Sequence, residues 1–241
     1  MYPTFLRIGD FEITSFGVMV ALGALAGMFV FQRELRRAAL PDDAINAALA
    51  GVLGGLAGAK VIWAIEFRHT APFLDLLLSR GGLSWFGGFV GGLAAGLTAL
   101  RVYGVPLVRG LAAASPGLAL GHAIGRVGCF LVGDDYGRPS TLPWAVAFPK
   151  GLPPTDVPVH PTQLYEAIPL VMLAWLLVRW RRHGVPDPVV LSRYFMLAGA
   201  LRFAIEFVRI NAPIVGPLTL AQLWCLALIG AGALLAVRSR G

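Results

Sequence analysis

The chain has 241 residues, of which 57% are hydrophobic and only 14% are charged, and its formal net charge is +7. This balance excludes an ordinary water-soluble domain, because a soluble core does not need so large an apolar share, and it places the chain among integral membrane proteins. The basic excess lies at the ends of apolar runs, in "RELRR" and "RWRRH". Membrane topology and anionic lipid headgroups explain it better than nucleic acid, which we do not expect as a partner.

Seven apolar runs have about the 20-residue length that spans the hydrocarbon core of a bilayer. They cover residues 14–32, 44–66, 84–105, 110–132, 164–180, 189–208 and 217–237. They predict an all-α, multi-pass integral membrane protein with seven transmembrane helices in a single domain, residues 1–241. Only Arg7 precedes the first run, so the start of the chain lacks the basic region of a cleaved signal peptide and is expected to remain in the mature protein.

The basic residues between the runs predict the orientation, because cytoplasmic loops hold the excess of Lys and Arg. If odd-numbered helices end in the cytoplasm, that side holds eleven: Arg33, Arg36, Arg37, Arg101, Arg109, Arg179, Arg181, Arg182, Arg193, Arg238 and Arg240. The other side holds six: Arg7, Arg68, Arg80, Arg138, Lys150 and Arg209. We therefore expect the amino terminus outside and the carboxyl terminus in the cytoplasm.

The third run begins "GGLSWFGGFVGGLAAG", with Gly88, Gly92 and Gly96 at four-residue spacing. Small residues at this spacing are typical of close helix packing in membranes. They also expose backbone that a ligand headgroup can approach closely. The two interpretations are compatible, and the sequence leaves both open.

The fourth run contains Arg126, about 10 Å from its predicted outer end at 1.5 Å per residue. A long side chain reaches the interface poorly over that distance, so a cavity or an anionic partner is the better interpretation. His122 lies four residues earlier on the same face, either as a packing residue or as part of a site. Lys60, near the end of the second run, is expected to reach the interface instead. The run's Cys129 and the last run's Cys225 show neither disulfide nor metal-ligand spacing.

The longest segment outside the runs, residues 133–163, is predicted to be an external loop. Its prolines exclude a regular helix, and Trp144 and Phe148 are expected at the membrane interface. The fifth run then begins "VHPTQLYEA", with His160, Gln163, Tyr165 and Glu166. These side chains suit either an ordinary helix start or a polar rim above a headgroup pocket.

The sixth run ends "LRFAIEFVRI", where Arg202, Glu206 and Arg209 form one polar stripe on an otherwise apolar helix. The stripe is either a self-neutralising ladder or, with two arginines to one glutamate, an unpaired cation that binds an anion. A phospholipid phosphate is the natural anion at that depth, and a guanidinium binds it bidentately.

Four segments together resemble one family, the phosphatidylglycerol–prolipoprotein diacylglyceryl transferases. "GRVGCFLVGDDYGRPS" is similar to the family signature Gly-Arg-x-Gly-Asn-Phe-x-Asn-Gly-Glu-x-x-Gly-Arg, and "GGLSWFGGFVGG", "HPTQLYEA" and "RFAIEFVR" follow in family order. The resemblance runs from about Phe16 to the last helix. It implies a seven-helix enzyme of the bacterial cytoplasmic (inner) membrane, without metal or cofactor. The enzyme would transfer the diacylglyceryl group of phosphatidylglycerol to the lipobox cysteine in the signal peptide of a preprolipoprotein, forming a thioether and releasing glycerol phosphate.

The resemblance also assigns residues. Arg126 and Arg202 correspond to two essential arginines, Asp134 stands where the family has glutamate, and Glu206 matches a family glutamate. Gly133 and Gly137 match family glycines, whereas Asp135 falls on an open position and is expected at the rim. The residues expected to bind substrate are Arg126, Gly87, Gly88, Gly133, Gly137, His160, Gln163, Tyr165 and Arg209.

The chain departs from the family pattern at several positions. Phe86 precedes Gly87 and Gly88 where the family has His-Gly-Gly, so the candidates for a base are His122, Asp134 and Glu206, or the arginine field alone. Other polar family positions hold Phe16, Cys129 and Val132. They leave open a paralogue that binds anionic phospholipid without catalysis. A small transporter is disfavoured, because no inverted repeat is visible.

Overall fold

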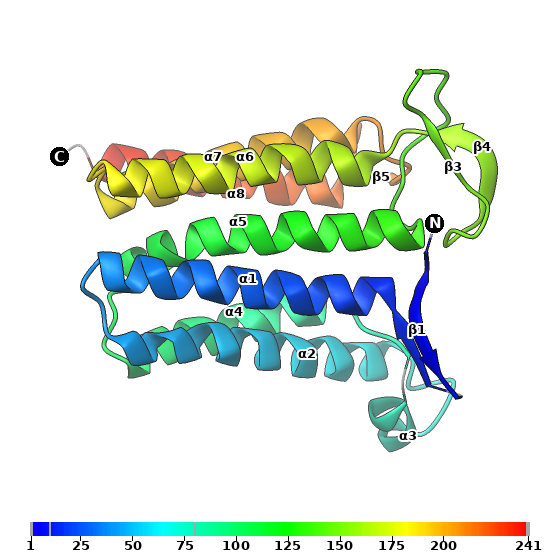
Figure 1. Cartoon of the computed structure of the whole chain (residues 1–241), viewed down its shortest axis with the longest axis horizontal. Helices are drawn as coiled ribbons and strands as arrows, with labels where there is room; N and C mark the ends of the chain where they lie inside the picture. Colours follow the sequence, from blue (N-terminus) through cyan, green and yellow to red (C-terminus); the bar gives the residue numbers. More distant parts are fainter. Residues whose placement is uncertain (1, 10, 80, 240–241) are drawn as a thin grey trace. The chain divides into compact units, whose positions relative to one another are not determined.

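The computed structural model describes residues 2–9, 11–79 and 81–239, so the basic residues Arg80 and Arg240 lie outside the described parts (Figure 1). The helices are α1 (Ser15–Arg37), α2 (Asn46–Glu66), α3 (Phe73–Leu78), α4 (Trp85–Val102), α5 (Leu107–Val132), α6 (Thr162–Arg182), α7 (Asp187–Glu206) and α8 (Leu220–Arg238), with a 3-10 turn, η1 (Asp42–Ile45), before α2. Each predicted apolar run forms a helix, so the mainly helical fold class is confirmed. The short α3 and three small hairpins were not predicted.

Six of the described helices are long and apolar enough to cross a membrane, namely α1, α2 together with η1, α4, α5, α7 and α8. They confirm a multi-pass membrane protein. The remaining long helix, α6, has a polar first turn and carries Arg179, Arg181 and Arg182 in its last turn, which shortens its apolar stretch. The seventh span therefore stays a prediction.

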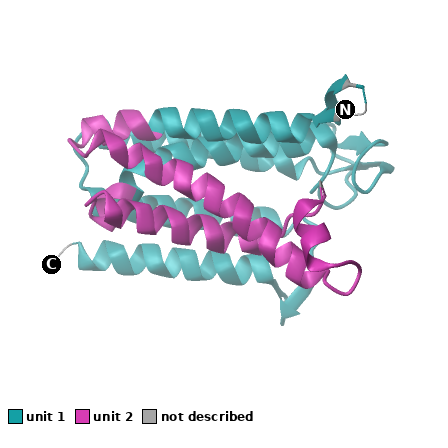
Figure 2. Cartoon of the chain, turned by 90° about the horizontal axis from the view of Figure 1, so that it is seen from below, with its two compact units in different colours: residues 1–30, 111–241 teal, residues 31–110 magenta. Residues whose placement is uncertain are grey.

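The chain forms two compact units, Met1–Val30 with Leu111–Gly241 and Phe31–Gly110, shown in teal and magenta in Figure 2. In the larger unit, α1 packs on α5 through glycines. A Cβ at Gly23 would lie 2.8 Å from the carbonyl oxygen of Gly121, and one at Gly27 would lie 2.9 Å from that of Gly117. The absence of side chains lets the two backbones approach closely, as in other small-residue membrane interfaces.

An apolar core joins α5, α6 and α7 in the same unit. Its buried residues are Ala119, Ala123, Leu170, Leu173, Ala174, Leu177 and Val190. Because α6 contributes four of these side chains, it lies among other helices rather than facing lipid all round. This packing fixes the end of α5 beside the start of α6.

The segment 133–163 is not helical, as predicted, and its strands β3 (Val146–Phe148) and β4 (Thr155–Val159) pair antiparallel (Figure 1). The ring of Tyr136 stacks on that of Phe148 with centroids 5.5 Å apart, and its hydroxyl donates to the carbonyl of Pro153 at 2.7 Å. Phe148 is therefore buried, and its predicted place at the membrane interface is wrong. Trp144 is exposed and donates its indole N–H to the hydroxyl of Tyr165 at 2.7 Å.

Two other antiparallel hairpins flank helices: β1 (Thr4–Ile8) with β2 (Phe11–Thr14), and β5 (Pro213–Val215) with β6 (Leu218–Thr219). The second leads into α8. Thr219 caps this helix in a reciprocal capping box with Gln222, which satisfies backbone N–H groups at the helix start.

In the smaller unit, α2 and α4 pack so closely that their glycines meet. A Cβ at Gly87 would clash with the carbonyl oxygen of Gly58 and lie 2.7 Å from Cβ of Ile62. A Cβ at Gly91 would lie 3.0 Å from Cα of Gly58. Close packing through glycines is therefore found, but its tightest contacts lie at Gly87 and Gly91. Of the predicted glycines, Gly92 is also tight, since a Cβ there would lie 3.0 Å from the carbonyl oxygen of Gly51, whereas Gly88 and Gly96 would make only ordinary contacts.

Lys60 takes protein partners in this unit. Its ammonium donates to the carbonyl oxygens of Ser79 at 2.8 Å and Gly81 at 2.6 Å, and lies 4.5 Å from the ring centre of Trp63. The side chain therefore ties α2 to the segment before α4.

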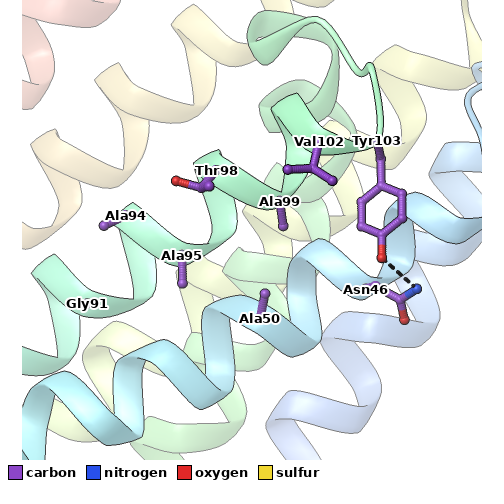
Figure 3. Close-up of a pocket in the computed structure, with 9 residues that line it drawn as sticks. All are labelled: Asn46, Ala50, Gly91, Ala94, Ala95, Thr98, Ala99, Val102 and Tyr103. Carbon is purple, nitrogen blue, oxygen red and sulfur yellow. Dashed lines mark hydrogen bonds between the residues drawn. The ribbon is translucent and has the colours of Figure 1, made fainter.

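Farther along α2 and α4, an open groove of about 530 Å³ lies over small residues, among them Ala50, Gly91 and Ala95 (Figure 3). A hydrogen bond of 3.2 Å from the side-chain amide of Asn46 to the hydroxyl of Tyr103 closes one end. The groove exists because side chains no larger than methyl leave room beside the helix contact.

We expect Gly87→Ala to lower the stability of the protein, because overpacking of a tight contact costs about 1–3 kcal/mol. The control is Gly96→Ala on the same helix. There the nearest atom to an added Cβ would be the carbonyl oxygen of Ala47 at 3.5 Å, an ordinary contact. Thermal unfolding in detergent should show a lower midpoint for Gly87→Ala alone, and equal shifts for both variants would contradict the packing described.

Candidate functional site

The polar site of the larger unit begins where α5 ends. Gly133 follows α5 with φ of +71°, a conformation that glycine adopts without strain, and the backbone N–H groups of Gly133 and Asp134 both donate to the carbonyl of Cys129, at 2.9 and 3.1 Å. Asp135 then also adopts a positive φ, +58°. This tight turn reverses the chain and points two adjacent aspartates in different directions.

Gly137 completes the turn. A Cβ there would lie 2.5 Å from the carbonyl oxygen of Val208 and 2.8 Å from Cγ2 of Thr162. The missing side chain lets the turn lie against both the start of α6 and the segment after α7. Gly133 and Gly137, predicted to bind substrate, thus first shape the backbone on which the site depends.

Glu166, on α6, is the central carboxylate. Its Oε2 lies 2.9 Å from Nε of Arg126, and its Oε1 lies 3.5 Å from Nε2 of His122 and 3.8 Å from Nε of Arg202. The side chain is only 3% exposed. A carboxylate buried so deeply requires cationic partners, and here it links residues of three helices.

Asp135 bridges two arginines. Its Oδ2 accepts from Nη1 of Arg126 at 2.9 Å, and its Oδ1 accepts from Nη2 of Arg209 at 2.8 Å. Burial alone would raise the pKa of this carboxyl, but the charge of Arg209 and the hydrogen bonds from both arginines outweigh it and hold the pKa below its ordinary value. The side chain is 48% exposed, as expected at a rim, yet its contacts with both arginines were not predicted.

Asp134, the residue with the family counterpart, faces elsewhere. Its backbone carbonyl accepts from the amide of Gln163 at 2.6 Å, while its Oδ1 is buried without a hydrogen-bond partner among the described residues. Burial raises the pKa of Asp134. The hydrogen bond with the thiol of Cys129 lowers this pKa and the charge of Asp135 raises it, so that the net shift is upward. Asp134 is therefore a better proton acceptor near neutral pH than an ordinary aspartate.

The stripe on α7 forms the predicted ladder. Glu206 pairs with Nη1 of Arg202 through Oε2, which also lies 3.7 Å from Nε of Arg209. Its Oε1 accepts from Asn211 at 2.6 Å and from Thr219 at 2.8 Å. Because Asp135 and Glu166 complete the neutralisation from other elements, the unpaired cation expected from the stripe is not found in the described part of the chain.

His122 is the half-exposed member of the cluster, with 53% of its side chain accessible and its Nε2 near Glu166. A carboxylate beside one ring nitrogen favours a defined orientation of the imidazole. His122 therefore shares the site with both arginines predicted from the sequence.

His160, Gln163 and Tyr165 support the loop. Gln163 is fully buried and holds the turn through its bond to Asp134. Nδ1 of His160 lies 3.3 Å from the hydroxyl of Tyr165, and the backbone carbonyl of His160 accepts from the N–H of Gly137 at 2.9 Å. No contact of His160 or Tyr165 with the three arginines is found among the described residues, and Gly87 and Gly88 belong to the other unit.

A cavity of about 180 Å³ opens beside the bridge between Asp135 and Arg209. Its lining residues are Asp135, Tyr136, Leu152, Pro153, Arg209, Ile210 and Asn211. Within the part of the chain that is described, no group of three His, Cys, Asp or Glu side chains is placed to hold a metal ion. The site offers guanidinium donors for an anion instead.

Sequence reasoning assigned Arg126, Arg202, Glu206 and His122 to one site, and the structure brings them together. Glu166 was expected only as one polar side chain of a helix start or rim, and its burial as the central counterion was not predicted. The only available signal was its spacing from Thr162, one helical turn earlier, which places it on the same face.

We expect Glu166→Gln to destabilise the protein by about 3 kcal/mol, because it removes one partner of a buried ion pair and leaves the charge of Arg126 less compensated. The matched control is Glu66→Gln on α2, where an exposed carboxylate accepts from Ser84 at 3.2 Å and an amide oxygen still can. Thermal unfolding of both variants in detergent is the measurement. An unchanged midpoint for Glu166→Gln would show that the carboxylate is not the buried counterion described.

Comparison with known proteins identifies the family of the chain. The family model of prolipoprotein diacylglyceryl transferase matches residues 3–238. Three phosphatidylglycerol–prolipoprotein diacylglyceryl transferases are similar over most of both chains: that of Nitratidesulfovibrio vulgaris (33% identity, 99% of this chain and 94% of the relative), that of Methylococcus capsulatus (31%, 94% and 91%) and that of Clostridium tetani (30%, 87% and 86%). The chain therefore belongs to the prolipoprotein diacylglyceryl transferase family.

Proposed function

We propose that this protein transfers the diacylglyceryl group of phosphatidylglycerol to the lipobox cysteine thiol in the signal peptide of a prolipoprotein. A thioether forms and glycerol phosphate leaves. Family membership over nearly the whole chain supports the reaction. In this chain, the observation that supports the reaction is the cluster of Arg126, Arg202 and Arg209. These arginines lie at the ends of apolar helices, where an anionic lipid headgroup would lie.

The reaction requires stabilisation of a leaving phosphate. The cysteine thiolate attacks the glycerol carbon that bears the phosphate ester, a C–S bond forms, and the C–O bond breaks with its electron pair going to oxygen. A phosphodiester with one negative charge thereby becomes a phosphomonoester, whose second pKa is about 6. Arg126 and Arg209 would hold the phosphate, and Arg126 and Arg202 would stabilise the charge that develops on it.

Arg126 has a donor for this purpose. It is 7% exposed, and its Nη2 is buried without a hydrogen-bond partner among the described residues. Most buried donors are satisfied, so one left open in a cationic site suits an anionic ligand. Arg202 is more accessible, with 25% of its side chain exposed.

The thiol must also lose its proton, because a free cysteine has a pKa of about 8.5. We assign the base to His122, which is accessible and lies beside Glu166. Its imidazole would take the thiol proton and later release it to the solvent or to glycerol phosphate. Asp134 is the second candidate because of its raised pKa. Glu206 is a counterion in this proposal, since its oxygens already accept from Arg202, Asn211 and Thr219 and lie 3.7 Å from Nε of Arg209.

We further propose one membrane domain with seven spans, an outside amino terminus, a cytoplasmic carboxyl terminus and residues 133–163 outside, in the bacterial cytoplasmic membrane. The distribution of basic residues supports the orientation. At 21 residues, α6 is about 31 Å long, enough to span the hydrocarbon core, and its packing among α5 and α7 reduces its need for an apolar surface. Reporter fusions after Lys150 and after His183 should report opposite sides, and the same side for both would exclude a spanning α6.

We expect wild-type protein to rescue a strain depleted of its own transferase, and Arg126→Ala and Arg202→Ala to abolish rescue. Loss of a charge-stabilising donor typically costs 100-fold or more in rate, roughly 3 kcal/mol. His122→Ala should reduce the rate by about 100-fold. The control, Arg182→Ala, removes an exposed arginine at the far end of α6 and should rescue.

Thioether formation with labelled phosphatidylglycerol and a lipobox peptide provides the direct measurement. Full activity of His122→Ala would show that His122 is not the base. Deprotonation of the thiol would then be assigned to Asp134 or to the positive charge of the arginines alone. Binding of phosphatidylglycerol by the folded wild type without any product would identify a non-catalytic, lipid-binding paralogue.

A further inference from the structure

The arginine cluster is electrically neutral without any substrate. Among the described residues, Arg126, Arg202 and Arg209 pair with three carboxylates, those of Asp135, Glu166 and Glu206. A lipid phosphate that entered this site would add a negative charge to a balanced set. Binding is therefore favourable only if one carboxylate gives up its arginines.

The three carboxylates differ in their freedom to move. Glu166 and Glu206 project from helices, and their side chains are 3% and 0% exposed. Asp135 lies in a turn, its side chain is 48% exposed, and it lines the 180 Å³ cavity. Only Asp135 can turn into water by a rotation of its side chain, without carrying a charge through the apolar core.

The contacts of Asp135 also match those of a phosphodiester. Its carboxylate has one negative charge and two oxygens, one of which accepts from Arg126 and the other from Arg209. A phosphodiester likewise carries one negative charge on two non-bridging oxygens, and guanidinium groups bind both anions with similar geometry. The exchange of one for the other preserves the charge balance and the hydrogen bonds. The open Nη2 of Arg126 offers the phosphate an additional donor.

We propose that Asp135 is an exchangeable counter-anion that occupies the phosphate position on Arg126 and Arg209 until the headgroup of phosphatidylglycerol displaces it. The identity of the lipid rests on the proposed function, but the exchange itself is a statement about anion binding. Asp135 lets the buried arginines keep a partner when the site is empty.

The exchange lowers the apparent affinity for the ligand. If a side chain of the protein occupies the binding site most of the time, the apparent affinity for the ligand is the intrinsic affinity multiplied by the fraction of time that the site is free. Removal of the carboxylate should therefore tighten phosphate binding, whereas removal of a structural counterion would weaken it by disordering the arginines. The sign of the change separates the two roles.

The test is calorimetric titration of the purified protein, in a detergent with an uncharged headgroup, with glycerophosphoglycerol, a soluble phosphodiester with one negative charge, as the probe. We expect Asp135→Asn and Asp135→Gly to bind about tenfold more tightly than the wild type. Glycine also relieves the positive φ of +58°, so the second variant protects the test against backbone strain. The control is Asp156→Asn on β4, an exposed aspartate of the same loop segment, which should bind as the wild type does.

Unchanged or weaker binding by both Asp135 variants would overturn the proposal. If Asp156→Asn bound the probe as much more tightly as the Asp135 variants do, the effect would be explained by net charge alone, and the proposal would also be overturned. The titration needs no prolipoprotein. A protein that binds as predicted but forms no thioether would contradict the proposed function and leave the exchange standing.

Discussion

The ion pair between Arg126 and the buried Glu166 is the interaction on which the site depends. Neither residue is tolerable alone in an apolar helix bundle, because an uncompensated charge there costs several kcal/mol. The pair holds the end of α5 against α6, and the second oxygen of Glu166 extends the link to His122 and to Arg202 on α7. One carboxylate thus sets the relative positions of three helices and of the groups proposed to act on substrate.

The glycine turn and the packing of the helices follow from the same requirement. Asp135 can reach Arg126 and Arg209 because Gly133 and its own positive φ reverse the chain directly after α5. The turn can lie against the segment after α7 because Gly137 has no side chain that would clash with the carbonyl oxygen of Val208. The site consequently holds two kinds of counterion, the buried Glu166 and Glu206 and the half-exposed Asp135, which we propose gives way to substrate. This division allows a site to be stable when empty and still accept an anion.

Much of this arrangement can be predicted from the sequence, for physical reasons. Helices follow from the lengths of the apolar runs, and Arg126 and Arg202 stand out because charge in such runs demands a partner. The residues that pair with these arginines cannot be predicted in the same way. Glu166 sits in a stretch that reads as an ordinary polar helix start, and only tertiary packing buries it. Which of two adjacent aspartates meets the arginines depends on the turn conformation, so Asp135 was expected only at the rim. Phe148 was misplaced because no local pattern shows that Tyr136 would cover it.

An experimental structure with phosphatidylglycerol bound tests the central claim most directly, namely that the arginines exchange one anion for another while Glu166 stays in place. The account predicts phosphate oxygens within hydrogen-bonding distance of Arg126 and Arg209, the Asp135 carboxylate turned into the cavity beside Asn211, and the Arg126–Glu166 pair intact. A phosphate bound elsewhere, or bound while Asp135 still bridges both arginines, would contradict it.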